Sequence, residues 1–211
     1  MYQQTAAHLV KACANILQGK QLKNSLKYIN EIASFEEQKL KKFNPDDVDE
    51  LLSILKVHAL YHISRVAKAL QLGEGSFETK WNRVYQADVI KIAQAHAVYH
   101  TGLNFVEGMK AIKVSKGLKA ILECLCRIHL AHSIVTYADG ALLCEYAKPK
   151  HLVQVEELLY SKVEEIRPQL LNIVEAYVSP ISDTGLNSVL GASDGRTYEH
   201  LLNAAACNPL N

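Results

Sequence analysis

The sequence predicts an all-α protein, an antiparallel bundle of about five or six helices around a central apolar helix. Three observations support this prediction. Apolar residues recur with helical spacing through most of the 211 residues, no segment alternates as a strand does, and one stretch is apolar on most sides. A helix that is apolar on most sides must be enclosed by other helices, so this stretch is expected at the centre.

The central helix is predicted at residues 117–137, GLKAILECLCRIHLAHSIVTY. Its polar residues form one ribbon of Lys119, Glu123 and Arg127, four residues apart, with opposite charges adjacent. The stretch is too short and too charged to span a bilayer. We therefore expect Leu125 and Ile128 to be fully buried between neighbouring helices.

The first helix is predicted at residues 2–17, and Gly19 ends it. One apolar face is formed by Leu9, Cys13, Ile16 and Leu17. The lysine-rich residues 20–43 are poorly periodic, which predicts a loop with one short helix near residues 22–33.

A strong helix start follows at Asn44-Pro45-Asp46-Asp47. Asn44 is expected to cap this helix, Pro45 suits its first turn, and the two aspartates face its positive end. Gly73 and Gly75 end it. A third helix is predicted at residues 77–109, with an inner face of Trp81, Val84, Tyr85, Val89, Ile92, Ala93, His96, Tyr99, His100 and Leu103.

The central helix ends near Asp139-Gly140, and Pro149 opens another helix that runs to residue 177. Pro168 lies inside this helix and is expected to kink or split it. Its inward residues are predicted to be Leu152, Val155, Leu158, Leu159, Val163, Ile166, Leu170 and Val174. A loop at residues 179–195 and a last helix at residues 197–207 complete a single domain of residues 1–211.

Composition narrows the class of protein. Lys and Arg number 23 against 22 Asp and Glu, so there is no basic excess to drive nucleic-acid binding. The opening segment does not read as a signal peptide. The chain has five cysteines, an odd number, and no two of them are spaced as CxxC. This pattern indicates reduced thiols of an intracellular protein.

Two histidine pairs have the spacing of metal ligands on one helix face, His58 with His62 and His96 with His100. However, the sequence contains neither HExxH nor the ExxH of carboxylate-bridged iron bundles. We interpret the histidines as residues at helix–helix boundaries and predict no metal site. The glycines are scattered and form no phosphate-binding loop, and glutamates lie among the lysines of residues 20–42. The sequence therefore shows no self-contained active site.

The two ends of the chain are similar in sequence to a known protein family. Residues 186–191 read LNSVLG, followed by Ser193-Asp194-Gly195, by Tyr198-Glu199 and by the closing PLN of residues 209–211. This pattern is similar to the C-terminal signature of acyl-CoA oxidases, and residues 1–9, MYQQTAAHL, resemble the helix after that family's Glu-Gly segment. Two departures from the family pattern are Ala192-Ser193 before Asp-Gly and Leu202-Asn203-Ala204 after Tyr-Glu.

The resemblance implies the C-terminal helical region of a peroxisomal, FAD-dependent enzyme that oxidises acyl-CoA to trans-2-enoyl-CoA and makes hydrogen peroxide. The family's catalytic Glu would fall upstream of Met1, so no catalytic residue is carried over. The residues nearest the flavin would be Gln3, Gln4 and Thr5. The other interpretation, that these are ordinary polar residues of a first helical turn, stays open.

The implied partners are the missing N-terminal oxidase domains, acyl-CoA through the full enzyme, and a second copy in a homodimer. FAD is expected on the full-length enzyme and not on this chain alone. The chain ends Pro-Leu-Asn rather than in a Ser-Lys-Leu-type peroxisomal address. A different class of function is also open, a stand-alone helical interaction module derived from the family and without catalytic activity.

Overall fold

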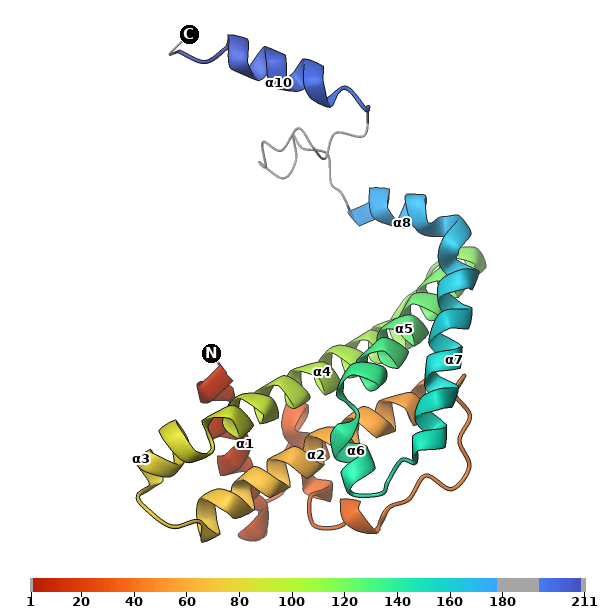
Figure 1. Cartoon of the computed structure of the whole chain (residues 1–211). Helices are drawn as coiled ribbons and strands as arrows, with labels where there is room; N and C mark the ends of the chain where they lie inside the picture. The colour runs from red at the N-terminus through yellow and green to blue at the C-terminus, as the bar shows by residue number, and fades with distance from the viewer. Residues whose placement is uncertain (1, 178–193, 210–211) are drawn as a thin grey trace. The chain divides into compact units, whose positions relative to one another are not determined.

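The computed structural model describes residues 2–177 and 194–209, and every regular element within them is a helix (Figure 1). The prediction of an all-α protein is confirmed. The chain forms two compact units, residues 1–165 and 166–211. Among the described residues, no helix combines the length and the hydropathy that a membrane span requires.

The first unit contains most of the helices. Its elements are α1 (Tyr2–Leu17), the 3-10 helices η1 (Asn24–Glu31) and η2 (Phe35–Glu37), α2 (Val48–Leu72), α3 (Phe77–Thr79), the π-helical turn η3 (Lys80–Val84), α4 (Gln86–Ala111), α5 (Lys116–Tyr137), α6 (Asp139–Leu143) and α7 (Pro149–Ile166). The second unit contains η4 (Arg167–Gln169), α8 (Leu170–Tyr177) and α10 (Thr197–Ala206).

The most deeply buried helix is α2. It packs against α1, α4, α5 and α6, and its apolar side chains are buried in every direction. Those without any exposed surface are Leu51, Ile54, Leu55, Val57, Ala59, Leu60 and Ile63. The prediction that residues 117–137 form the central helix is therefore wrong, because α2 occupies that position.

Helix α5 is only partly enclosed. Cys126, Leu130 and Ile134 recur every four residues along one buried face, and Cys124 and Ala131 are buried on a second one. Leu125 and Ile128 are half-buried rather than fully buried, and 44% of the Leu118 side chain is exposed. An apolar composition shows that a helix can be enclosed, but it does not show which of its sides neighbouring helices cover.

The start of α2 differs in detail from the prediction. Asp47 is the N-cap, because its Oδ1 accepts the backbone N–H of Asp49 at 2.9 Å. Asn44 instead begins the preceding turn, where its Oδ1 accepts the N–H of Asp46 at 3.1 Å. The end of the helix is as predicted, since Gly73 is its C-cap.

The lysine-rich segment holds more helix than expected. η1 lies where one short helix was predicted, and η2 adds a further turn. Three buried aromatic and aliphatic side chains, Tyr28, Ile29 and Phe35, join the main core. The segment is thus anchored by a few apolar residues that are too irregularly spaced to give a helical period.

The predicted helix at residues 77–109 is interrupted by η3. The π-helical turn buries Trp81, whereas 60% of Val84 is exposed, so Val84 does not belong to the inner face. Lys80 is 8% exposed, and its Nζ donates to the carbonyls of Leu70 at 2.5 Å and Gly73 at 3.0 Å. This ammonium satisfies carbonyls at the end of α2, which explains why a lysine is buried there.

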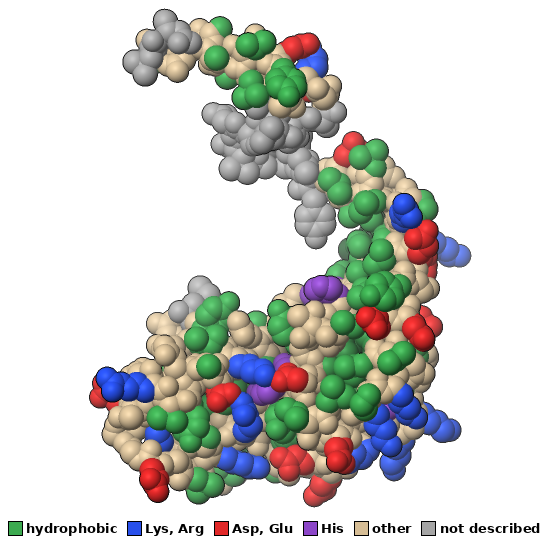
Figure 2. All heavy atoms as spheres, viewed as in Figure 1, with side chains coloured by type: hydrophobic (Ala, Val, Ile, Leu, Met, Phe, Trp, Pro, Cys, Tyr) green, Lys and Arg blue, Asp and Glu red, His purple; other side chains and the backbone are tan. Residues whose placement is uncertain are grey.

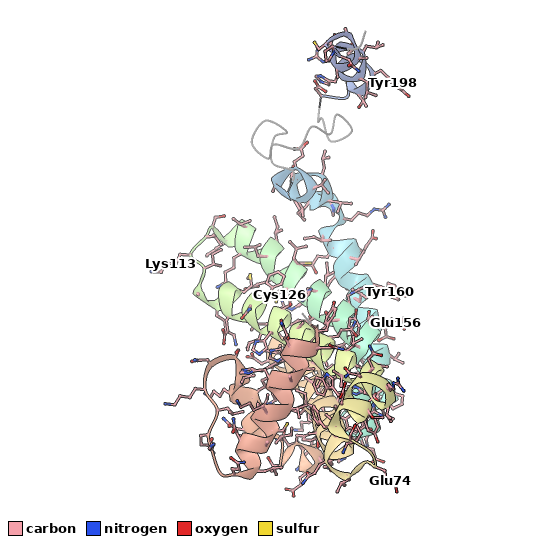
Figure 3. All side chains as sticks on the ribbon, turned by 90° about the vertical axis from the view of Figure 1, so that its left-hand side faces the viewer. Glu74, Lys113, Cys126, Glu156, Tyr160 and Tyr198 are labelled. Carbon is pink, nitrogen blue, oxygen red and sulfur yellow. The ribbon has the colours of Figure 1, made fainter. Side chains whose placement is uncertain are left out.

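Proline residues mark the last helices as predicted. Pro149 is the first residue of α7, and Pro168 lies in the short η4 that separates α7 from α8. Val155 and Leu158 face inward, but Val163 is 47% exposed. The outer side of α7 carries Tyr160, whose hydroxyl donates to Glu156 one turn earlier at 3.3 Å (Figure 3).

The predictions for the C-terminal part are tested only in places. Most of the loop predicted at residues 179–195 lies outside the described residues, as does the whole LNSVLG segment of residues 186–191. The last helix, predicted at residues 197–207, is observed as α10. Leu170 and Val174 of α8 are each about half exposed, at 54% and 49%, and are not the inward residues that we expected.

Candidate functional site

The first candidate is a groove between α1 and the aromatic residues that follow α2. Gln3 and Gln4 line a cavity of about 490 Å³ together with Ala7, Val10, Lys11, Ala14, Phe77 and Trp81. The rings of Phe77 and Trp81 stack with centroids 5.5 Å apart and an interplanar angle of 23°. Thr5, the third predicted residue, is half-buried and is not among the residues that line the cavity.

The groove suits binding better than acid–base chemistry. Its polar side-chain groups are two amides, one ammonium and the indole N–H of Trp81, and none of its lining residues carries a carboxylate or an imidazole. Amides that donate and accept hydrogen bonds beside an aromatic wall can contact the polar edge of a flat heteroaromatic ring. These residues therefore fit contact with one part of a flavin, and they do not by themselves form a complete FAD site.

The second candidate is a polar cluster in which two histidines are buried and an aspartate and a lysine are partly exposed. His58 and His62 lie one turn apart on α2, and Asp139 lies at the start of α6. Asp139 Oδ1 is 3.2 Å from His58 Nδ1 and 3.3 Å from His62 Nε2, while Lys91 Nζ of α4 donates to Oδ2 at 2.5 Å. The cluster thus connects three helices through one carboxylate.

The two histidines of this cluster could be paired from the sequence, but Asp139 and Lys91 could not. Asp139 is 77 residues from His62, so no local spacing connects them. Gly140 is required at this point, because a Cβ there would lie 2.8 Å from the His58 carbonyl oxygen and 3.0 Å from His62 Nε2. Only the folded arrangement of α2, α4 and α6 brings these groups together.

Burial keeps both histidines of the cluster neutral. Burial, followed by the charge of His62, lowers the pKa of His58 to about 3, and burial also lowers the pKa of His62. For Asp139, partial burial acts to raise the pKa, but the Lys91 hydrogen bond and the two histidines outweigh it and lower the pKa. At neutral pH the cluster therefore consists of one ammonium, one carboxylate and two neutral imidazoles.

The arrangement has the outline of a metal site. One ligand atom from each of His58, His62 and Asp139 lies within 4.8 Å of the others. However, His58 Nδ1 accepts the Gly140 N–H at 3.2 Å, and the Lys91 ammonium binds the carboxylate. These hydrogen bonds account for the arrangement as a link between helices, so the absence of a metal site stays our prediction.

The second histidine pair also connects helices. His96 Nδ1 lies 2.8 Å from the hydroxyl of Tyr28, and His100 Nε2 donates to the carbonyl of Ser25 at 2.6 Å. Both partners belong to η1. This pair therefore attaches the lysine-rich segment to α4, in agreement with our interpretation of the histidines as boundary residues.

Comparisons with known proteins give a consistent result. The family model described as acyl-CoA oxidase matches residues 47–211. Peroxisomal acyl-coenzyme A oxidase 1 of Bos taurus is 28% identical over 226 residues, which cover 100% of this chain and 33% of the relative. Acyl-coenzyme A oxidase acox-1.2 of Caenorhabditis elegans is 30% identical over 222 residues, which cover 100% of this chain and 31% of the relative. The chain thus spans about a third of the length of these curated relatives.

Solved structures agree with this similarity. Acyl-CoA oxidase 1 of Arabidopsis thaliana superposes with a TM-score of 0.83 at 25% identity, covering 100% of this chain and 32% of that structure. Acyl-CoA oxidase-2 of Caenorhabditis elegans, solved with FAD, ascaroside-CoA and ATP, gives a TM-score of 0.79 at 25% identity over 100% of this chain and 31% of its own. The similarity extends along the whole of this chain.

Proposed function

This chain belongs to the acyl-CoA oxidase family, and from that premise we propose that it forms the C-terminal helical region of a peroxisomal, FAD-dependent acyl-CoA oxidase. The complete enzyme would convert acyl-CoA and oxygen to trans-2-enoyl-CoA and hydrogen peroxide. The observation that carries this proposal is a match that extends over the entire chain but covers only about a third of each relative.

Within such an enzyme, the first groove is the region nearest the flavin. The amides of Gln3 and Gln4 would supply hydrogen bonds, while Phe77 and Trp81 would supply an apolar wall that excludes water. Thr5 would support this turn of α1 from outside the groove. When bound, FAD would accept a hydride from the acyl chain and pass electrons to oxygen.

The chain's remaining role would be structural. Its core of α1, α2, α4 and α5 would hold the groove in place against the upstream domains, and it would contribute to a homodimer. Because the catalytic Glu of the family would lie upstream, we expect neither FAD binding nor peroxide production from the 211-residue chain alone.

Reading the genomic DNA upstream of the codon for Met1 tests this proposal. We expect an in-frame coding segment for a flavin-binding region, including a Glu-Gly pair directly before α1. The extended protein should contain FAD by absorbance and release peroxide with acyl-CoA, while the 211-residue chain should do neither. Stoichiometric FAD on the 211-residue chain would contradict the proposal of a missing upstream part.

The second candidate function is a stand-alone helical interaction module derived from the same family. It is favoured by the chemistry of the groove, whose lining residues include no carboxylate and no imidazole. An upstream stop codon in frame, together with a transcript that begins at Met1, would favour this module. The same result would remove the oxidase activity that we propose.

Localisation is a separate part of the proposal, supported by relatives named peroxisomal. We expect a fluorescent fusion of the extended protein to give punctate signal that coincides with a peroxisomal marker. A fusion of the 211-residue chain alone should stay diffuse in the cytosol. Punctate signal from the short fusion in cells without the longer protein would contradict this expectation.

A further inference from the structure

A basic cavity on the first unit shares no lining residue with the groove or with the histidine cluster. It has a volume of about 540 Å³ and is lined by Lys39, Leu40, Lys41, Leu142, Glu145, Tyr146, Ala147, Lys148, Pro149, Lys150 and His151. Four of these residues are lysines, and Glu145 is the single acid among them. Figure 2 shows basic side chains gathered at the lower right, where Figure 1 places the beginning of α7 and the loop before α2.

Most of these lysines have no acidic partner within the described part of the chain. Lys39 is engaged, because its Nζ donates to the Cys144 carbonyl at 3.0 Å and lies 4.0 Å from Glu145 Oε2. The side chains of Lys41, Lys148 and Lys150 are exposed and take part in none of the ion pairs or hydrogen bonds of the described residues. Their like charges repel each other in the absence of an anion.

The beginning of α7 adds to this positive potential. The helix has 18 residues, and its first turn contains no acidic residue but does contain Lys150 and His151. The positive end of a helix ordinarily attracts carboxylates, whereas here it is surrounded by cations. The local electrostatics therefore favour a bound anion in this cavity.

His151 provides an independent observation. Its side chain is 4% exposed, and its Nδ1 accepts the N–H of Lys148 at 3.2 Å. Burial and the charges of Lys150 and Lys148 lower its pKa, so the ring is neutral and carries its hydrogen on Nε2. No described residue accepts that hydrogen, which leaves a donor without a protein partner on a side chain that lines the cationic cavity.

We propose that this cavity binds an oligophosphate, a chain of two or more phosphates that is either free or carried by a nucleotide. Lysine ammoniums bind phosphate as point charges, and His151 Nε2–H can donate to a phosphate oxygen. The four lysines and one glutamate give the lining a net charge of 4 − 1 = +3, which a single carboxylate would leave largely unbalanced. Leu40, Leu142 and Pro149 form an apolar wall beside the cations.

Titration of the 211-residue chain with inorganic tripolyphosphate in a calorimeter tests the proposal. We expect one molecule bound per chain, with an affinity that falls as salt rises. Changing Lys41, Lys148 and Lys150 together to alanine should raise the Kd about tenfold or more, since three charge-assisted contacts are lost. Glu145→Gln should lower the Kd, because it removes the one negative charge of the lining.

The matched control changes Lys20, Lys23 and Lys113 together to alanine. These lysines are exposed, lie outside the cavity and produce the same change in net charge. We expect this control to bind tripolyphosphate as the wild type does. An equal loss in the control, or the absence of one-to-one binding, would show that only the general surface charge attracts phosphate and would overturn the proposal.

Two further probes define the ligand. A nucleoside triphosphate that binds more tightly than tripolyphosphate would support a nucleotide whose base contacts the apolar wall. Equal affinities would support recognition of the phosphate chain alone. A glutamate-rich peptide of matched charge that binds as tightly as tripolyphosphate would overturn phosphate recognition in favour of an acidic protein segment. This inference does not depend on the proposed oxidase function.

Discussion

At the scale of single residues, the cluster of His58, His62, Asp139 and Lys91 connects α2, α6 and α4 at the edge of the core, where the two histidines are buried and the other two side chains are partly exposed. Its two imidazoles are nearly inaccessible to solvent, at 2% and 1% exposure. A buried polar network stabilises a fold only when its members are paired, and one atom, His62 Nδ1, has no hydrogen-bond partner here. The network should therefore respond sharply to changes in protonation and in packing.

Acid should destabilise the protein partly through His58. Its pKa is lowered from 6.5 to about 3, so the unfolded chain binds the proton more readily than the folded one. This contribution to stability is complete above pH 6.5 and is lost as pH falls toward 3. Neighbouring groups that face His58 are His62, Asp139 and Lys91.

We expect the wild-type free energy of unfolding to decrease between about pH 7 and pH 5 more steeply than that of His58→Asn, by up to about 1.4 kcal/mol per pH unit. Asparagine keeps an acceptor for the Gly140 N–H but cannot be protonated in this range. Urea melts of both proteins at several pH values measure the two slopes. Parallel slopes would show that His58 does not contribute to the acid sensitivity.

Gly140 should tolerate no side chain. The Cβ of an alanine would lie 2.8 Å from the backbone oxygen of His58, so Gly140→Ala should destabilise the protein by about 1–3 kcal/mol. The control is Gly108→Ala in α4, where no atom lies within 4 Å of the added carbon. Helix propensity predicts that this control stabilises by about 0.5–1 kcal/mol. Similar effects of the two substitutions in denaturant melts would contradict the close contact at Gly140.

At the scale of helices, local signals were reliable where the backbone itself imposes the boundary. Gly19, with a φ of +77°, follows α1, and Pro168 separates α7 from α8, as the sequence predicts. Signals from apolar composition were less reliable. Leu17 was assigned to the inner face of α1 but is 76% exposed, because a helical period does not show where its neighbours end.

The candidate sites were harder to predict from the sequence than the helix boundaries, because each site combines residues from several helices. His58 and His62 could be paired from their spacing on one helix, but Asp139 and Lys91 could not, since both lie on other helices. Gln3 and Gln4 came from family resemblance, while their aromatic neighbours Phe77 and Trp81 are distant in sequence. Contacts between elements depend on helix packing, which a single sequence does not specify.

The stability of point mutants can test whether α2, and not α5, is the central helix. Leu55 of α2 has no exposed surface, so Leu55→Ala should cost about 2–5 kcal/mol of stability. Leu125 of α5 is only half-buried, and Leu125→Ala should cost about 1–2 kcal/mol. Lys119→Ala on the same helix should change stability by at most about 1 kcal/mol. A larger loss for Leu125→Ala than for Leu55→Ala, in urea melts at one pH, would contradict this order.

At the scale of the whole molecule, the apolar residues of the first and last helices differ in exposure, and this decides which of them could contact the proposed upstream part. The apolar face of the first helix is not bare, because Ala6, Leu9 and Cys13 are buried in the core. The terminal helix α10 differs, because Leu201 and Leu202 are 46% and 70% exposed. If the chain is one part of a longer oxidase, residues of α10 are the better candidates for a surface that another part covers.

The isolated chain should therefore self-associate through α10 rather than through α1. Changing Leu201 and Leu202 together to lysine should keep the helical circular-dichroism signal and shift sedimentation toward the monomer, because it removes exposed apolar area without touching the core. Adding two lysines elsewhere, at the exposed Gln18 and Gln154, controls for the change in net charge. Leu9→Lys should instead unfold the chain, since it places an unpaired charge at a position with no exposed surface. A wild-type chain that stays monomeric at high concentration, with the Leu201 and Leu202 variant unchanged from it, would show that α10 is not an uncovered interface.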